Sequence, residues 1–134
     1  MNPSKSVAEE TLKLIKKFQE NEITEYHIYT KLAAIEKNPE NKAILEKIAN
    51  EEKAHYEFWK HYTGMEVAPV RSRVWRYFWI VRLFGLTFGI KLMENGETKA
   101  QDNYNKVLAE IPEVQRLIDE ENVHENRLIN LIQE

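Results

Sequence analysis

Apolar residues recur along most of this chain at intervals of three and four, the spacing that places them on one face of an α-helix. No alternation of apolar and polar residues is long enough to predict a β-strand. The helices are expected at about 4–37, 39–62, 82–109 and 111–133, with an earlier start of the third left open. The fold class is therefore all-α, and a single domain over residues 1–134 is long enough to bury one core.

Proline and glycine mark the ends of these helices. Asn38-Pro39 ends the first helix and starts the second, with Asn38 as the cap and Pro39 in the first turn. Gly64 is expected to stop the second helix. The stretch from Gly64 to Arg82 contains Pro69 and is interpreted as a connection, too long for a tight turn.

Each helix has a buried stripe that is apolar at both ends and polar in its middle. Residues that share a stripe follow one another in steps of three and four. The stripes are Leu12, Ile15, Gln19, Glu22, Tyr26, Tyr29 and Ala33; Leu45, Ile48, Glu52, His55, Trp59 and Tyr62; Leu83, Leu86, Ile90, Met93 or Glu94, Glu97, Ala100 or Gln101, Tyr104, and Val107 or Leu108; and Val114, Leu117, Glu121, His124, Leu128 and Leu131.

The polar positions are expected to lie at one level of the molecule. A buried carboxylate costs several kcal/mol unless it is paired or bound to a metal, so four such interruptions must be compensated together. Glu22 and Glu52 lie about equally far from the Asn38-Pro39 turn, which places them opposite each other in antiparallel helices. A single long crossover after Gly64, as in ferritin-like four-helix bundles, would bring the third helix parallel to the second.

Two Glu-x-x-His pairs give this polar layer its chemistry. Glu52 and His55 share one helix face, as do Glu121 and His124. The alternative, a set of buried salt bridges, needs arginine or lysine in the stripes, which contain neither. Carboxylates with one imidazole per metal suit iron or manganese rather than structural zinc. Glu25, Glu51, Glu120 and Glu125, and the histidines His27 and His61, are expected to face solvent.

Composition excludes several classes of protein. The chain has no cysteine, which rules out disulfides, thiolate zinc sites and iron–sulfur clusters. A net charge of −3 does not favour nucleic acid as a partner. No signal peptide is recognised at the N-terminus, so a cytoplasmic location is expected. The apolar stretch from Val74 to Met93 is not interpreted as a membrane span because it contains Arg76, Arg82 and Lys91.

Residues 70–90 combine aromatic side chains with arginines. This segment holds more aromatic surface than one small bundle can bury, which favours a homodimer interface or a segment exchanged between two copies. Contact with a membrane surface is the minority interpretation. The residues are Trp75, Tyr77, Phe78, Trp79, Phe84 and Phe88, with Arg71, Arg73, Arg76 and Arg82 between them.

Over its whole length the chain resembles the rubrerythrin branch of the ferritin-like superfamily. The segments that carry the resemblance are ENEITEYHIY from Glu22 to Tyr29, EKAH at 52–55, ENGE at 94–97 and ENVH at 121–124. The resemblance implies two irons per site, with manganese or zinc as substitutes. It implies the metal ligands Glu22, Glu52, His55, Glu94, Glu97, Glu121 and His124.

Further roles follow from this resemblance. Glu97 and His55 are expected to exchange places as ligands when the oxidation state changes, and Tyr29 and Tyr104 to support ligand glutamates. Glu97 rather than Glu94 could be the bridging ligand, and the sequence leaves this open. Rubrerythrins add a cysteine-ligated domain that this chain lacks. Its 70–90 segment is more similar to rubrerythrin-like domains fused to membrane iron transporters of the vacuolar type.

The leading functional hypothesis is a di-iron oxidoreductase. It would oxidise Fe(II) with peroxide or dioxygen, or reduce peroxide. The second hypothesis is a module that binds or senses iron and delivers it to a membrane transporter without turnover. The third is a metal-free helical interaction domain.

Overall fold

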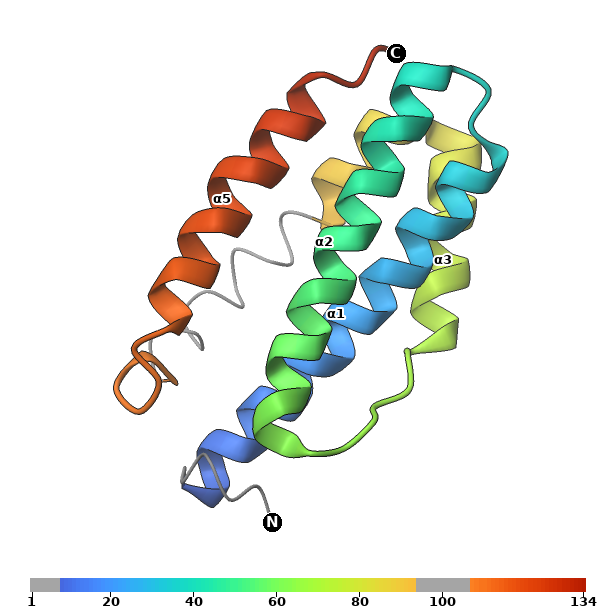
Figure 1. Cartoon of the computed structure of the whole chain (residues 1–134). Helices are drawn as coiled ribbons and strands as arrows, with labels where there is room; N and C mark the ends of the chain where they lie inside the picture. The colour runs from blue at the N-terminus through green and yellow to red at the C-terminus, as the bar shows by residue number, and fades with distance from the viewer. Residues whose placement is uncertain (1–7, 94–106) are drawn as a thin grey trace.

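The computed structural model describes residues 8–93 and 107–134, apart from the side chains of Glu121, Asn122 and His124. The helices are α1 (Glu9–Ile35), α2 (Pro39–Thr63), α3 (Arg71–Phe84) and α5 (Val114–Asn130), and residues 86–93 are also helical. No strand occurs among the described residues, so the all-α prediction is confirmed. Helix α2 packs between α1 and α5, while α3 packs on α1 (Figure 1).

The turn between α1 and α2 forms as predicted. The Asn38 side chain accepts hydrogen bonds from the backbone N–H groups of Glu40 (2.9 Å) and Asn41 (3.1 Å). Pro39 occupies the first helical position, where a missing N–H costs nothing. Gly64 ends α2 in the left-handed conformation, with φ of 65°. The turn therefore fixes the register of the α1–α2 hairpin.

The connection after α2 differs from the prediction. Residues 71–84 form α3, so the segment expected to be a connection as far as Arg82 is mostly helical. The preceding loop is fastened to α1: the Gln19 amide donates to the Met65 carbonyl (2.7 Å), and the Val70 N–H donates to the Thr24 hydroxyl (2.9 Å). The crossover is therefore a helix that covers α1, and Leu83, predicted to be buried, is 73% exposed near its end.

Two glycines allow the chain to fold back on α3. Gly85 ends α3 with φ of 99°, a conformation that side chains rarely adopt. The Glu134 carboxylate then accepts hydrogen bonds from the N–H groups of Leu86 (2.6 Å) and Thr87 (2.9 Å), which start the next helical segment. A Cβ atom at Gly89 would collide with Cγ2 of Val81 on α3. The spacing Gly85-x-x-x-Gly89 thus marks a helical hairpin.

Replacing Gly89 by alanine is expected to lower the free energy of unfolding by about 1–3 kcal/mol, the usual cost of overpacking. The same exchange in an open helix would stabilise it by up to about 1 kcal/mol. The sign of the change in the free energy of unfolding therefore shows whether Gly89 is packed against α3. Urea denaturation measures the change. Adding Val81→Ala should recover most of the loss because it removes the colliding methyl group. A Gly89→Ala protein more stable than the wild type would contradict this packing.

Hydrogen bonds at both ends align α5 antiparallel to α2. The Tyr62 hydroxyl donates to Glu113 Oε2 (2.7 Å) at one end. At the other end, the Asn41 amide group donates to the Gln133 carbonyl (2.8 Å) and accepts from its N–H (2.9 Å). Midway between these two hydrogen-bonded ends, the turn of α2 that contains Glu52 lies opposite the middle turns of α5. Helix α5 ends at Asn130, so the predicted core residue Leu131 is 58% exposed.

The buried apolar side chains form two clusters rather than one. The first lies around the α1–α2 turn and the second around the opposite ends of these helices. In α1 the sequence passes from Phe18 in the second cluster to Ile28 in the first, and in α2 from Ile48 to Trp59. Most of the buried residues between the two clusters are polar, and Ile23 and Tyr56 are the apolar exceptions. The interrupted stripes of α1 and α2 therefore correspond to a polar layer between two apolar cores.

Candidate metal centre

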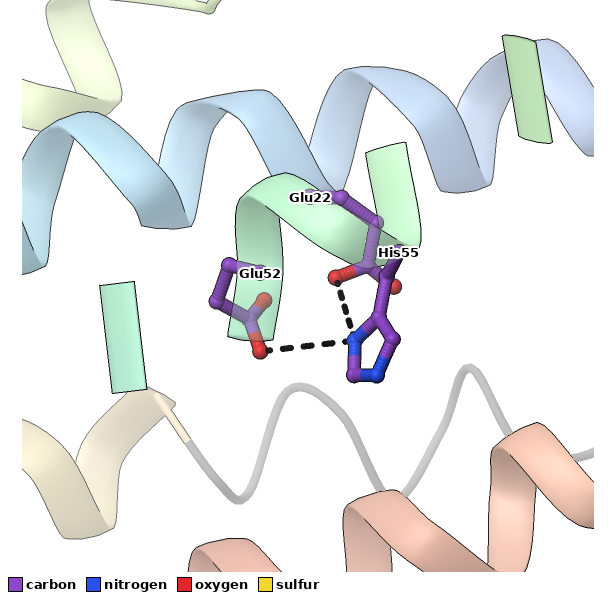
Figure 2. A group of neighbouring side chains, drawn as sticks. All are labelled: Glu22, Glu52 and His55. Atoms are coloured by element: carbon purple, nitrogen blue, oxygen red, sulfur yellow. Dashed lines mark ion pairs between the residues drawn. The ribbon is translucent and has the colours of Figure 1, made fainter. Parts of the chain in front are cut away.

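Three of the predicted ligands meet in this polar layer. Glu22 comes from α1, and Glu52 and His55 come from successive turns of α2 (Figure 2). The Nδ1 atom of His55 lies 3.6 Å from Glu22 Oε2 and 3.8 Å from Glu52 Oε1. The three residues are 2%, 0% and 6% exposed in chain order. One ligand atom from each lies within 4.8 Å of the others, close enough to share a metal ion.

Glu52 is the least compensated side chain of the group. Neither of its carboxylate oxygens receives a hydrogen bond from the described part of the chain. Burial raises the pKa of Glu52 well above its ordinary value, and the negative charges of Glu22, Glu125 and Glu25 raise it further. An ionised carboxylate in such a place requires a cation, which a bound metal would provide.

Glu125 also belongs to this layer, contrary to the expectation of a solvated face. It is 7% exposed, and α5 places it against Glu52. Burial raises the pKa of Glu125 to about 7. The Glu52 carboxyl group opposes this rise because, when protonated, it can donate to Glu125, and the negative charges of Glu25 and Glu22 reinforce the rise. A sequence signal existed, because Glu125 precedes the buried Leu128 by three residues and so lies on the same helix face.

Glu25 was likewise expected in solvent and is only 4% exposed. In contrast to Glu52, it has a cationic neighbour: Arg73 of α3 places Nη2 at 3.9 Å from Glu25 Oε1. The same guanidinium donates to Asn21 Oδ1 at 2.6 Å. The predicted absence of arginine from the stripes therefore holds for α1 and α2, but the crossover helix supplies one from outside. Glu25 is best explained as half of an ion pair.

The remaining predicted residues have mixed outcomes. Glu94, Glu97 and Tyr104 lie outside the described residues. Helix α5 carries Glu121 and His124, but their side chains are outside the described part. Tyr29 is buried in the first apolar cluster, and its contact with a ligand glutamate stays a prediction. His61 is exposed as expected, whereas His27 is partly buried, and burial together with Arg71, Lys53 and Lys31 lowers its pKa.

The donors of this layer fit a hard or borderline cation. Carboxylate oxygens and an imidazole nitrogen bind iron and manganese well, and thiolates, which soft metals prefer, are absent from the sequence. The uncompensated carboxylate of Glu52 and the burial of all three side chains agree with the same chemistry. What this arrangement can do is hold a metal ion away from bulk water.

The first 63 of the 134 residues are similar to a known protein family. Residues 1–63 match the family model described as Rubrerythrin. The matched segment contains α1 and α2, and hence Glu22, Glu52 and His55. The resemblance to rubrerythrins noted from the sequence is thus confirmed over this segment, and the similarity to domains fused to membrane transporters stays a prediction. No curated protein and no solved structure matches the chain.

Proposed function

Because residues 1–63 are rubrerythrin-like, we propose that the chain is a di-iron carboxylate oxidoreductase. It would oxidise Fe(II) with peroxide or dioxygen, or reduce peroxide. The observation that carries this proposal is the buried group of Glu22, Glu52 and His55, in which Glu52 receives no hydrogen bond from the described residues. Such a group destabilises the folded protein when no cation is bound, and a bound cation compensates its negative charge.

The proposed ligands are shared between two halves of the bundle. The α1–α2 hairpin would supply Glu22, Glu52 and His55. The rest of the set, Glu94, Glu97, Glu121 and His124, follows from the resemblance, as do an exchange of ligands between Glu97 and His55 and the supporting roles of Tyr29 and Tyr104. The antiparallel register of α2 and α5 supports this division because it brings the turn of Glu52 opposite the turns that carry Glu121 and His124.

When bound, iron would supply the redox chemistry, giving the electrons that cleave the O–O bond of peroxide. The chain's own residues bind, shield and handle protons. Glu22 and Glu52 offer negative charge, which favours the more oxidised metal. Glu125 has a pKa of about 7 in the metal-free protein, so its carboxyl group can hold or give up a proton near neutral pH. The two apolar clusters on either side exclude water from the layer.

Two histidines of α2 offer a matched test. His55 is 6% exposed in the layer, whereas His61 lies on the exposed side of the same helix. Under anaerobic titration, His55→Ala is expected to weaken Fe(II) binding by more than about tenfold, because second-shell changes alone cost 10–100-fold. His61→Ala should bind Fe(II) as the wild type does. Equal binding by wild type and His55→Ala would contradict the metal centre.

Turnover separates this proposal from the second candidate, a module that binds or senses iron and passes it on. Stopped-flow mixing of the ferrous protein with peroxide or dioxygen should give rapid oxidation, and His55→Ala should slow it. Sluggish oxidation of a protein that still binds and releases Fe(II) would favour the second candidate. Absence of metal from the purified protein, together with no Fe(II) binding, would favour a helical interaction domain. Cytoplasmic location stays a prediction.

A further inference from the structure

Two rows of exposed aromatic and aliphatic side chains lie along residues 75–92, a stretch that also carries exposed cations. On α3, the spacing of four residues places Trp75, Trp79 and Leu83 in one row, and they are 48%, 52% and 73% exposed. A second row follows the same spacing on residues 84–92 and is 39% to 65% exposed; it consists of Phe84, Phe88 and Leu92. We define these six residues as the aromatic face.

The segment that carries the aromatic face is positively charged. Residues 67–93 contain five cations and no acidic residue, which leaves a net charge of −8 for the rest of a chain whose total is −3. Arg71, Arg76, Arg82 and Lys91 are exposed, and none of them forms a salt bridge with a described carboxylate. Within the described part of the chain, these four charges are therefore not compensated by a salt bridge.

Two of the exposed arginines of α3 lie close to aromatic rings of the same helix. The guanidinium of Arg82 lies 6.0 Å from the ring centre of Trp79, and that of Arg76 lies 5.3 Å from the ring centre of Tyr77. Tryptophan with arginine alongside is the combination that lies at a lipid–water boundary, with the rings among the headgroups and the cations against phosphate. No helix among the described residues is both long and apolar enough to cross a bilayer.

We propose that the aromatic face binds the surface of a membrane that contains anionic lipids. The sequence favoured a homodimer through the same segment, but a two-fold contact would bring each patch of cations against its copy. A lipid surface of opposite sign compensates these charges, which is the reason for choosing it. The inference does not depend on the proposed redox function, since none of the six residues belongs to the polar layer.

The test uses the purified chain with vesicles of phosphatidylcholine, either alone or with phosphatidylglycerol added. The protein is expected to co-sediment with the anionic vesicles only, and less so as the salt concentration rises. Tryptophan emission should shift to shorter wavelength on binding. That shift would come from Trp75 and Trp79, because the third tryptophan, Trp59, is already fully buried.

Variants assign the binding to this face. Each cation removed in Arg76→Gln and Arg82→Gln is expected to weaken partitioning by about fivefold, the effect typical of a basic residue at an anionic surface. Trp75→Ser with Trp79→Ser should abolish both partitioning and the emission shift. Lys16→Gln with Lys17→Gln removes two exposed cations of α1 and should leave partitioning unchanged. All variants should retain Fe(II) binding.

Three results would overturn the proposal. The first is failure of the wild-type protein to partition into anionic vesicles. The second is an equal loss of partitioning in the α1 lysine control. The third, which would assign the face to a second copy, is a dimer in sedimentation velocity that dissociates on Trp75→Ser with Trp79→Ser while vesicle binding stays unchanged. A protein that binds Fe(II) but does not bind vesicles would refute this inference without contradicting the proposed metal centre.

Discussion

Replacing Glu52 by glutamine is expected to have opposite effects on metal binding and on metal-free stability. Fe(II) binding should fall by more than about 100-fold, since even residues that only orient ligands account for 10–100-fold. The metal-free variant should be more stable at neutral or alkaline pH by roughly 1–3 kcal/mol, because an amide cannot ionise, and burial together with the charges of Glu22 and Glu125 disfavours ionised Glu52. The reason is that Glu52 is fully buried and receives no hydrogen bond from the described residues.

Metal analysis and urea denaturation of the same preparations measure the two effects. The matched control is Glu57→Gln, an exposed glutamate on the same helix whose side chain is 53% exposed and pairs with Lys53 at 3.8 Å. This control should change Fe(II) binding little and stability by no more than about 0.5 kcal/mol. Full iron content in Glu52→Gln, or a metal-free variant less stable than the wild type, would contradict the role assigned to Glu52.

The metal-free protein is expected to lose stability as the pH rises towards neutrality. A carboxyl group whose pKa is raised on folding contributes stability that is complete below its unfolded pKa and is lost as the pH rises through the folded value. For Glu125 that window runs from 4.5 to about 7. Its largest contribution is about 3 kcal/mol, at 1.36 kcal/mol for each pKa unit. Glu52 acts in the same direction.

Thermal melting of the metal-free protein across this pH range measures the loss. Fe(II) should reverse it, because the ion binds the deprotonated carboxylates, so the rise in melting temperature on adding Fe(II) should grow with pH. Glu125→Gln should flatten the pH dependence. Glu120→Gln, on the same helix and 45% exposed beside Arg116, should not. A metal-free protein whose stability increases between pH 5 and 7 would show that the buried carboxylates are compensated in another way.

The fold could be predicted best where one helix face settles the packing. All six predicted stripe residues of α2 are buried, and Asn38-Pro39 and Gly64 limit the helix as expected, because capping and chain reversal are local properties of the sequence. The crossover was harder to predict. Arginines and aromatic residues alternate closely there, so the helical spacing of α3 gives no single apolar stripe, and only Val74 of this helix is fully buried.

The metal centre shows the same division between local and long-range information. Glu22, Glu52 and His55 could be predicted because each lies on a stripe and the turn sets their common level. Glu125 was missed although its spacing to Leu128 was a signal, since Glu121, His124 and Glu125 all lie near one face of α5 and the rotation of a helix about its axis depends on its neighbours. Arg73 was missed for a similar reason: its partner Glu25 is distant in sequence and is reached only because α3 covers α1.

The division of the hydrophobic interior has a consequence for how an ion enters. Each apolar cluster holds one end of the bundle together, while between them several carboxylates repel one another in the absence of a cation. Cohesion is therefore weakest across the middle, where local opening costs least. A metal ion that enters through such an opening would join the two ends into one cooperative unit. The metal-free protein is therefore expected to open more readily than the metal-bound protein. Metal binding would then close the path by which the ion entered.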